Sequence, residues 1–273
     1  MAMGLCSGRA DVRQLRWVDR EVQDCLAAVK RTKPFVYGLT NYVAANLSAN
    51  VLLAVGAAPA IGAAPGWPAA FGAGAGAVWI NAAALMSSGA DTLLEAARAA
   101  HEAGTPWVLD PVAMGAGAAP YDAIIRELLQ FQPTVVRGNA SELIALAGGS
   151  AGAKGVESTK GSDAALAFIS ELARAARTIV AVSGEVDYVT DGTALLAIPG
   201  GDVRLTQVTG AGCSLGALIA ALLAVQRDKL LATGAAHAIY AVAAERARAH
   251  ARGTGSFGVS LVDELSLLIP DSP

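Results

Sequence analysis

The sequence predicts a three-layer α/β protein, with helices on both faces of a mostly parallel central sheet. Short apolar runs alternate with longer alanine-rich stretches in which apolar residues recur at the helical period. Strands that alternate with helices form βαβ units, and such units build a parallel sheet covered on both faces. Near Asp191 and Gly192 two strand-like runs are separated by a two-residue turn, which predicts an antiparallel hairpin at the sheet edge.

The apolar runs place the individual elements along the chain. The expected strands cover residues 35–40, 77–81, 106–110, 134–137, 178–183, 187–190 and 195–198. The expected helices include 91–104 and 162–177, and two long ones at about 212–227 and 231–251. Residues 1–33 are an N-terminal segment that the sequence leaves poorly determined. Because the chain has no internal repeat and no linker of disordered composition, we expect residues 1–273 to form a single domain.

Charge and cysteine usage exclude several classes of protein. The net charge is −3 and the pI about 5.6, so the surface has no basic field that would attract nucleic acid. Cys6, Cys25 and Cys213 are odd in number and far apart, which is neither a disulfide framework nor a zinc site. This usage is typical of the reducing cytoplasm.

Residues 34–90 contain no charged side chain, which raises the question of a membrane span. Several prolines and glycines interrupt the segment, so no stretch reaches the roughly 20 helix-compatible apolar residues that a bilayer requires. The first 17 residues have no apolar core of signal-peptide length. We therefore expect a cytoplasmic protein without a membrane partner, whose apolar excess is buried or faces another subunit.

The most informative segment is a glycine-rich turn, Gly210-Ala211-Gly212, which opens directly into an apolar helix. Glycines let the backbone turn its amides toward one point, and the helix N-terminus adds partial positive charge, so the turn can bind a phosphate. An ordinary tight strand-to-helix turn has the same sequence pattern. Cys213 lies on the first turn of this helix, where the dipole is expected to lower its pKa and let it accept a proton. The alternative is that Cys213 is a small buried hydrophobe.

Two further segments offer polar groups at strand ends. Asp110 ends an expected strand, which is where open α/β sheets bind ligands. After the next strand, Arg137 and Glu142 could hold phosphate and Mg²⁺ respectively. However, Asn139 or Ser141 followed by Glu142 is also a helix-capping pattern without catalytic meaning.

Other patterns are set aside. The GAGAGA run at 72–77 imitates a dinucleotide fingerprint but precedes a strand, and there is no Walker lysine loop. His101, His237 and His250 lack metal-ligand spacing, and we interpret them as surface or hydrogen-bonded residues.

Taken in order, several motifs resemble the hydroxyethylthiazole kinase family over nearly the whole chain from Thr40. These are LTNYVAANLSANVLLAVGAAPAIG, VLDPVAMGAGA, RGNASELIALAG, VSGEVDYVTDG, VTGAGCSLGA and GTGSF. RGNASE together with Cys213 after GAG is specific, because related ribokinase-like kinases usually carry aspartate at that position. The resemblance implies a ribokinase-like fold, a homotrimer with active sites between subunits, and transfer of a phosphoryl group from ATP with Mg²⁺. The acceptor would be the hydroxyl of 4-methyl-5-(2-hydroxyethyl)thiazole, in thiamine synthesis.

The motif match also implies a role for individual residues. Arg137, Ser183 and Asn41 would bind the nucleotide, and Asp110 and Glu142 would organise Mg²⁺. Gly210 and Gly212 would form the anion hole, Cys213 would face the substrate hydroxyl, and Ile61 and Gly210 would contact the substrate.

The sequence departs from the family at the pocket. Ile61 replaces a common methionine, residues 81–85 replace an NIGTL-like stretch, and acidic residues usual before that strand are missing. These changes bear on substrate identity more than on reaction type. The alternatives are a kinase for another heterocyclic alcohol such as hydroxymethylpyrimidine, and an ATP-dependent hydrate dehydratase of the same fold. A non-catalytic binding module would have lost Asp110, Glu142 or the glycine turn, and all are present.

Overall fold

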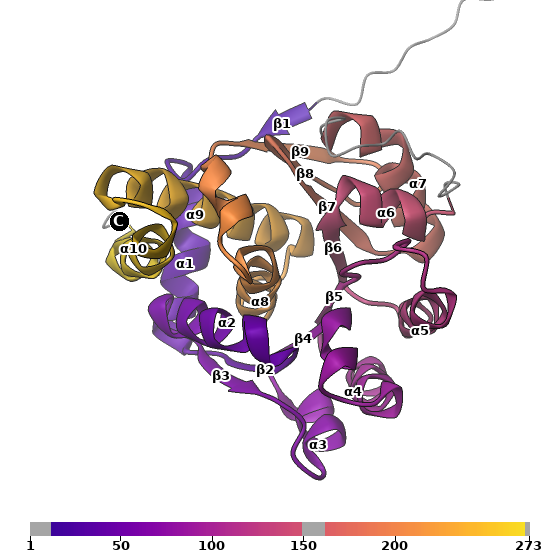
Figure 1. The fold of residues 1–273 in the computed structure, drawn as a ribbon. Helices are drawn as coiled ribbons and strands as arrows, with labels where there is room; N and C mark the ends of the chain where they lie inside the picture. Colours follow the sequence, from indigo (N-terminus) through magenta and orange to yellow (C-terminus); the bar gives the residue numbers. More distant parts are fainter. Residues whose placement is uncertain (1–11, 149–161, 271–273) are drawn as a thin grey trace, which may run out of the picture.

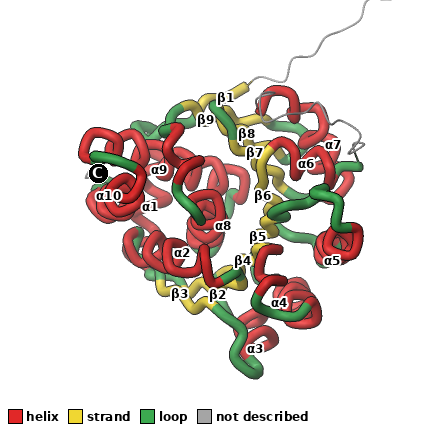
Figure 2. Tube along the Cα trace, viewed as in Figure 1, coloured by secondary structure: helices red, strands yellow, loops and turns green. Residues whose placement is uncertain are grey.

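Apolar strands form the middle layer of the molecule (Figures 1 and 2). The structure is a computed structural model and describes residues 12–148 and 162–270. The strands of these residues are β1 Val12–Gln14, β2 Phe35–Leu39, β3 Ala58–Ile61, β4 Ala77–Asn81, β5 Trp107–Asp110, β6 Val135–Asn139, β7 Ile179–Ser183, β8 Val186–Thr190 and β9 Leu195–Pro199. They form one sheet in the order β1-β9-β8-β7-β6-β5-β4-β2-β3. All neighbouring pairs are parallel except those of β8, which is antiparallel to β7 and β9. The predicted α/β/α architecture is confirmed.

Helices cover both faces of the sheet (Figure 1). One face carries α1 Arg20–Thr32, α2 Tyr42–Ala54, α8 Ala211–Leu223, α9 Lys229–His250 and α10 Thr254–Leu267. The other carries α3 Trp67–Gly74, α4 Ala90–Ala103, α5 Ala119–Leu129, α6 Ala140–Leu146 and α7 Leu166–Ala176. Short 3₁₀ turns lie at η1 Ala82–Met86, η2 Ser162–Ala165 and η3 Val203–Gln207.

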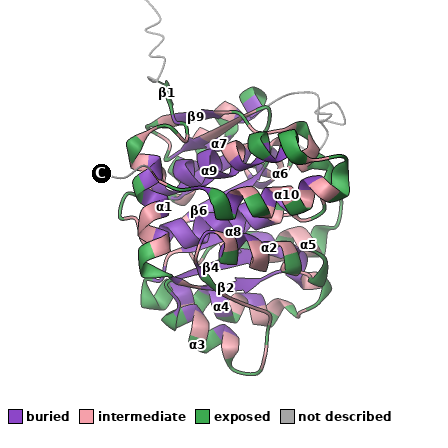
Figure 3. Cartoon of the chain, turned by 90° about the vertical axis from the view of Figure 1, so that its left-hand side faces the viewer, coloured by how far each residue is buried: buried purple, intermediate pink, exposed green. Residues whose placement is uncertain are grey.

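Each face has its own apolar core, and α8 occupies the centre of one of them (Figure 3). Nearly every residue of α8 is buried, because neighbouring helices enclose it against β4 and β5. Burial of alanine-rich helices in this layer accounts for much of the apolar excess in the sequence. Among the described residues, no helix combines the length and apolarity that a bilayer span needs.

The structure differs from the sequence-based elements at the sheet edges and in the N-terminal segment, where residues 20–32 form α1. Two strands were not predicted: β1, which is short and exposed, and β3, whose sequence APAI contains a proline. Both are edge strands, where neither a continuous apolar run nor a full hydrogen-bond ladder is required. The turn between β8 and β9 has four residues instead of the expected two, and β1, not the hairpin, forms the edge.

The GAGAGA run has a packing role at its first glycine. A Cβ added at Gly72 would lie 2.8 Å from the carbonyl oxygen of Ala96 and 2.9 Å from Ala99 Cβ, so α3 and α4 can approach closely only at a glycine. Gly72→Ala is expected to lower the free energy of unfolding by about 1–3 kcal/mol, through overpacking. Denaturant unfolding measures this loss, and Gly74→Ala is the control because open space surrounds it. Equal stability of both variants would contradict the packing role.

Candidate active site

Polar side chains gather at the carboxyl ends of neighbouring strands. Asn81 ends β4, Asp110 ends β5, and the two residues are paired in register. Arg137 lies near the end of β6, and Ser183 ends β7. Since parallel strands end at one edge of the sheet, residues far apart in the chain meet here. The glycine turn before α8 faces the same edge.

Asp110 is the most enclosed acidic group of this site, with no exposed side-chain surface. Its Oδ2 lies 3.7 Å from Arg137 Nη1, and its Oδ1 has no hydrogen-bond partner. Burial raises the pKa of Asp110 to about 7, with a further contribution from Glu142, although Arg137 opposes the shift. The ion pair is therefore too long to offset the desolvation of the carboxylate. Oδ1 remains available to a ligand.

Arg137 connects three parts of the site. Its Nη2 donates to Ser183 Oγ at 2.8 Å, which joins β6 to β7. A Cβ added at Gly212 would lie 3.1 Å from Arg137 Nη1, so the guanidinium sits directly against the glycine turn. The charged group is nearly buried, and its Nε has no partner. A cation held in this way can bind an anion that enters between Ser183 and the turn.

The glycine turn brings two helix N-termini together. Gly210 is the N-cap of α8 with φ of +85°, a conformation that favours glycine. A Cβ at Gly210 would lie 3.2 Å from Ala44 Cα, in the first turn of α2. Asn41 caps α2 by accepting a hydrogen bond from the Ala44 amide at 2.8 Å. Two positive helix ends next to Arg137 make a site for an anion such as a phosphate chain.

Cys213 lies beside these groups, but the prediction that the pKa of its thiol is lowered is wrong. Burial raises the pKa of Cys213 to about 11, and the negative charges of Asp110 and Glu142 add to the rise. Hydrogen bonding from Asn81 and the charge of Arg137 oppose it without reversing it. The thiol is neutral at physiological pH, so the lowered pKa expected from the helix N-terminus does not prevail over desolvation.

If the Cys213 thiol is neutral, its replacement should leave the pH dependence of turnover unchanged. Cys213→Ser is expected to keep turnover within about tenfold of the parent, because no thiolate is lost. The pH–rate profile between pH 6 and 9 should be the same in both proteins, since a group of pKa about 11 does not titrate there. Steady-state kinetics across this range measure both. A pH dependence that disappears in Cys213→Ser would assign the base role to the thiol.

Glu142 is engaged with the backbone on both oxygens. Its Oε2 accepts from the Asn139 amide at 2.9 Å, and Asn139 Oδ1 accepts from the Glu142 amide, which completes a capping box on α6. Its Oε1 accepts from the Ala113 amide at 3.0 Å and so holds the loop after β5. The capping interpretation is therefore confirmed. A metal-binding role would use the remaining lone pairs.

Asp110 and Glu142 fit the small share of the ligands that a protein would supply to Mg²⁺. Asp110 Oδ1 is buried and unpaired, and Glu142 is close enough to raise the pKa of Asp110. In the described part of the chain, no three His, Cys, Asp or Glu side chains gather as a complete metal-binding set. Mg²⁺ commonly binds through one or two carboxylates and completes its shell with water and substrate phosphates.

Comparison with known proteins shows which family the chain resembles. The model of the hydroxyethylthiazole kinase family matches residues 26–271. The chain belongs to this family. A hydroxyethylthiazole kinase from Burkholderia thailandensis is 72% identical over 95% of the chain and 99% of its own length. The structure of the hydroxyethylthiazole kinase protein from Pyrococcus horikoshii OT3 matches with a TM-score of 0.82 and 36% identity, covering 90% of this chain and 93% of that one. Pyridoxal kinase from Bacillus subtilis, at 16% identity and a TM-score of 0.56 over 78% of this chain and 92% of its own, shares the ribokinase-like fold.

Membership of this kinase family makes the position of Ile61 informative. Ile61 ends β3, and β4 and β2 lie between β3 and β5 in the sheet. The register places Ile61 level with Val108, two residues before Asp110. Three spacings of about 4.8 Å and two residues of about 3.3 Å separate Ile61 from Asp110 by roughly 16 Å. Hence it does not join the Asp110–Arg137 group, and lies at the far end of the same sheet edge.

Two residues that the sequence analysis did not assign lie beside Asp110. Asn81 is fully buried, donates weakly to Asp110 Oδ2 at 3.5 Å, and accepts from the Ala83 amide at 2.9 Å. Trp79 Nε1 is buried without a partner and faces Gly216 of α8. A polar residue that ends a buried strand was the available signal for Asn81. The sequence predicts that Trp79 lies in a strand, but it contains no signal that Trp79 belongs to the site.

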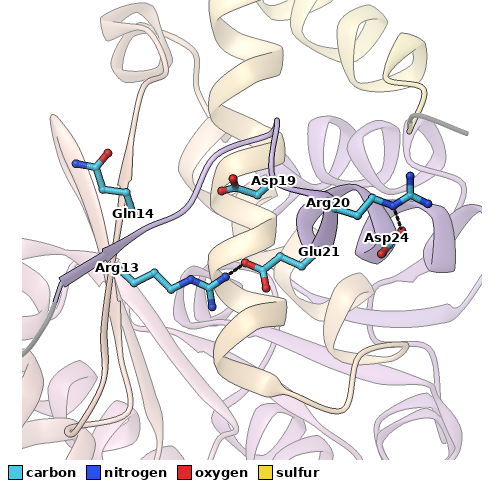
Figure 4. A pocket seen from close by; sticks show the side chains of 6 residues that line it. All are labelled: Arg13, Gln14, Asp19, Arg20, Glu21 and Asp24. Carbon is cyan, nitrogen blue, oxygen red and sulfur yellow. Dashed lines mark hydrogen bonds and ion pairs between the residues drawn. The ribbon is translucent and has the colours of Figure 1, made fainter. Parts of the chain in front are cut away.

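A polar pocket lies elsewhere, between β1 and α1 (Figure 4). It is lined by Arg13, Gln14, Asp19, Arg20, Glu21 and Asp24. Arg13 pairs with the partly buried Glu21, and Arg20 pairs with Asp24 at 3.0 Å in solvent. The pocket adjoins the β1 edge of the sheet and contains none of the site residues.

Proposed function

We propose that the protein transfers the γ-phosphoryl group of ATP to the hydroxyl of 4-methyl-5-(2-hydroxyethyl)thiazole, giving ADP and the phosphate ester for thiamine synthesis. One observation carries the proposal: Arg137, which is paired with Asp110, lies against the glycine turn where two helix N-termini meet. Positioning and electrostatic stabilisation supply most of the catalysis of phosphoryl transfer, and this geometry supplies both.

Each group then has a role. Arg137, Ser183 and Asn41 bind the nucleotide, and the amides of Gly210 and Gly212 stabilise charge on the migrating group. Asp110 and Glu142 hold Mg²⁺, which would neutralise phosphate charge when bound. Because the transition state is loose, the alcohol needs no strong base, which suits a neutral Cys213. Ile61 contacts the thiazole end of the substrate, and Gly210 its hydroxyl end.

A homotrimer with sites between subunits completes the proposal, and exposed apolar side chains support it. Tyr42 is 72% exposed and Met86 is 65% exposed, and both follow strands that end at the site. Val43 on α2 is also exposed. A neighbouring subunit would cover them. Light scattering should give three times the chain mass of 27.4 kDa, and a monomer would contradict it. The cytoplasmic location and single-domain organisation belong to the same proposal, and one continuous sheet supports the latter.

The test of function is ATP consumption with Mg²⁺ and hydroxyethylthiazole, with hydroxymethylpyrimidine in parallel. Formation of a thiazole phosphate ester is expected, with little turnover of the pyrimidine. Pyrimidine phosphate as the main product would favour the other heterocyclic alcohol. Repair of a hydrated nicotinamide nucleotide, without ester formation, would favour the dehydratase. The Asp110→Asn variant controls for contaminating ATPase.

A further inference from the structure

Helix α9 carries two buried polar side chains that the proposed mechanism leaves unused. His237 and Tyr240 are one turn apart on this 22-residue helix, and both are almost fully buried. The helix packs along α8 and behind β8 and β9 (Figure 1). Most polar groups buried in a core are hydrogen-bonded, so the partners of His237 Nδ1 and of the Tyr240 hydroxyl show what they hold, whereas His237 Nε2 has no partner.

His237 holds the turn that follows Ser183. Its Nδ1 lies 2.6 Å from Asp187 Oδ2, so Nδ1–H donates to the carboxylate. The other oxygen of Asp187 accepts from the Gly184 amide at 2.8 Å. Gly184 directly follows Ser183, whose hydroxyl accepts from Arg137. The short β7–β8 turn is thereby tied to α9 through a charge-assisted hydrogen bond.

Tyr240 holds the glycine turn from the same helix. Its hydroxyl donates to the carbonyl oxygen of Ala211 at 2.8 Å, and it lies 2.8 Å from Ser214 Oγ. Ala211 stands between Gly210 and Gly212. The peptide whose amides face the anion site is thus fixed from behind by a buried phenol.

Together these contacts surround the anion site. Arg137 joins Ser183 to Gly212 across the front of the site, while α9 joins the Gly184 turn to Ala211 behind it. We propose that His237, Asp187 and Tyr240 are positioning residues that fix the spacing of the two turns between which the ATP phosphates bind. This proposal rests on the proposed function, because it requires ATP in that gap.

A purely structural role makes a different prediction. If the contacts only stabilise the core, their loss lowers the melting temperature and leaves ATP affinity unchanged. If they set the spacing of the turns, their loss weakens ATP binding while the KM for the alcohol changes little. ATP affinity therefore separates the two roles.

The experiment measures the Kd for ATP by titration calorimetry, together with the two KM values. His237→Leu removes the donor, whereas His237→Asn retains one, because asparagine Nδ2 occupies the place of histidine Nδ1. Tyr240→Phe removes only a hydroxyl. His250→Leu is the matched control, since His250 is the exposed last residue of the same helix.

We expect His237→Leu and Tyr240→Phe to raise the Kd for ATP about tenfold, as the loss of a buried hydrogen bond implies. His237→Asn should stay within about threefold of the parent, and His250→Leu should be unchanged. Lower stability with unaltered ATP affinity in both altered proteins would overturn the proposal. If His237→Leu fails to fold, Tyr240→Phe decides it.

Failure of the proposed function would be recognised separately. A parent protein that binds ATP but phosphorylates no thiazole alcohol contradicts the proposed reaction, while the ATP affinities still judge the positioning role. A parent protein that binds no ATP overturns both.

Discussion

Asp110→Asn is expected to lower kcat about a thousandfold and, at the same time, to stabilise the fold above pH 7. Activity falls because the amide cannot supply the negative charge with which Asp110 Oδ1 would help to hold Mg²⁺ beside the phosphates. Stability rises because the carboxylate is fully buried, 3.7 Å from Arg137, and its pKa is raised to about 7. That pKa already includes the attraction to Arg137, so a neutral isostere is more stable than the ionised form.

The sign of the pH effect follows from proton linkage. Between the unfolded pKa of 3.8 and the folded value of about 7, the folded protein binds more protons than the unfolded one. Stability of the parent protein therefore decreases as pH rises through this window, by at most about 4 kcal/mol. The asparagine variant lacks this loss. Its advantage should be full at pH 8 and absent near pH 4.

Thermal unfolding of parent and variant at pH 4, 6 and 8, with turnover at pH 8, measures both effects. A melting temperature that is lower in Asp110→Asn at pH 8 would contradict the account of burial. Unchanged turnover at saturating Mg²⁺ would remove Asp110 from the catalytic machinery. Loss of activity with gain of stability is the result that a strained functional carboxylate predicts.

Gly212→Val is expected to lower kcat/KM by at least about a hundredfold, the size of effect seen when an oxyanion donor is removed. A Cβ alone would already lie 3.1 Å from Arg137 Nη1, and the valine methyls would extend into the space between the turn and the guanidinium. Arg137 cannot simply move aside, because Ser183 holds Nη2 at 2.8 Å. The substitution therefore closes the anion site from inside.

A graded series makes this prediction sharp. Gly212→Ala should lose less activity than Gly212→Val, since only its Cβ meets the guanidinium. Gly255→Ala on α10 is the control, because a Cβ there meets no atom within 4 Å. Steady-state kinetics with ATP varied measures the loss, and circular dichroism checks the fold. Parent-like kinetics in Gly212→Val would place the phosphate elsewhere.

The central strands and the glycine turn could be predicted from the sequence because their signals are local. A buried run such as residues 77–81 is apolar in all but its last residue, and β4 has these bounds. A glycine with φ of +85° before an apolar helix is likewise a property of its own segment. The motifs around Asp110 and Arg137 carried the family resemblance for the same reason. Edge strands β1 and β3 lack such signals, since exposed pairing needs no apolar pattern.

Only the tertiary structure decided how the site residues act. The helix N-terminus predicted an acidic Cys213, but enclosure by other segments raises its pKa, and desolvation depends on neighbours that are remote in sequence. The capping role of Glu142 was established only when the amides of Asn139 and Ala113 met its two oxygens, and its metal-binding role stays a prediction. His237 had no motif at all, because its partner Asp187 lies 50 residues away on strand β8. Charge, hydrogen bonding and burial act through space, so local sequence specifies which groups are present and the fold decides what they do.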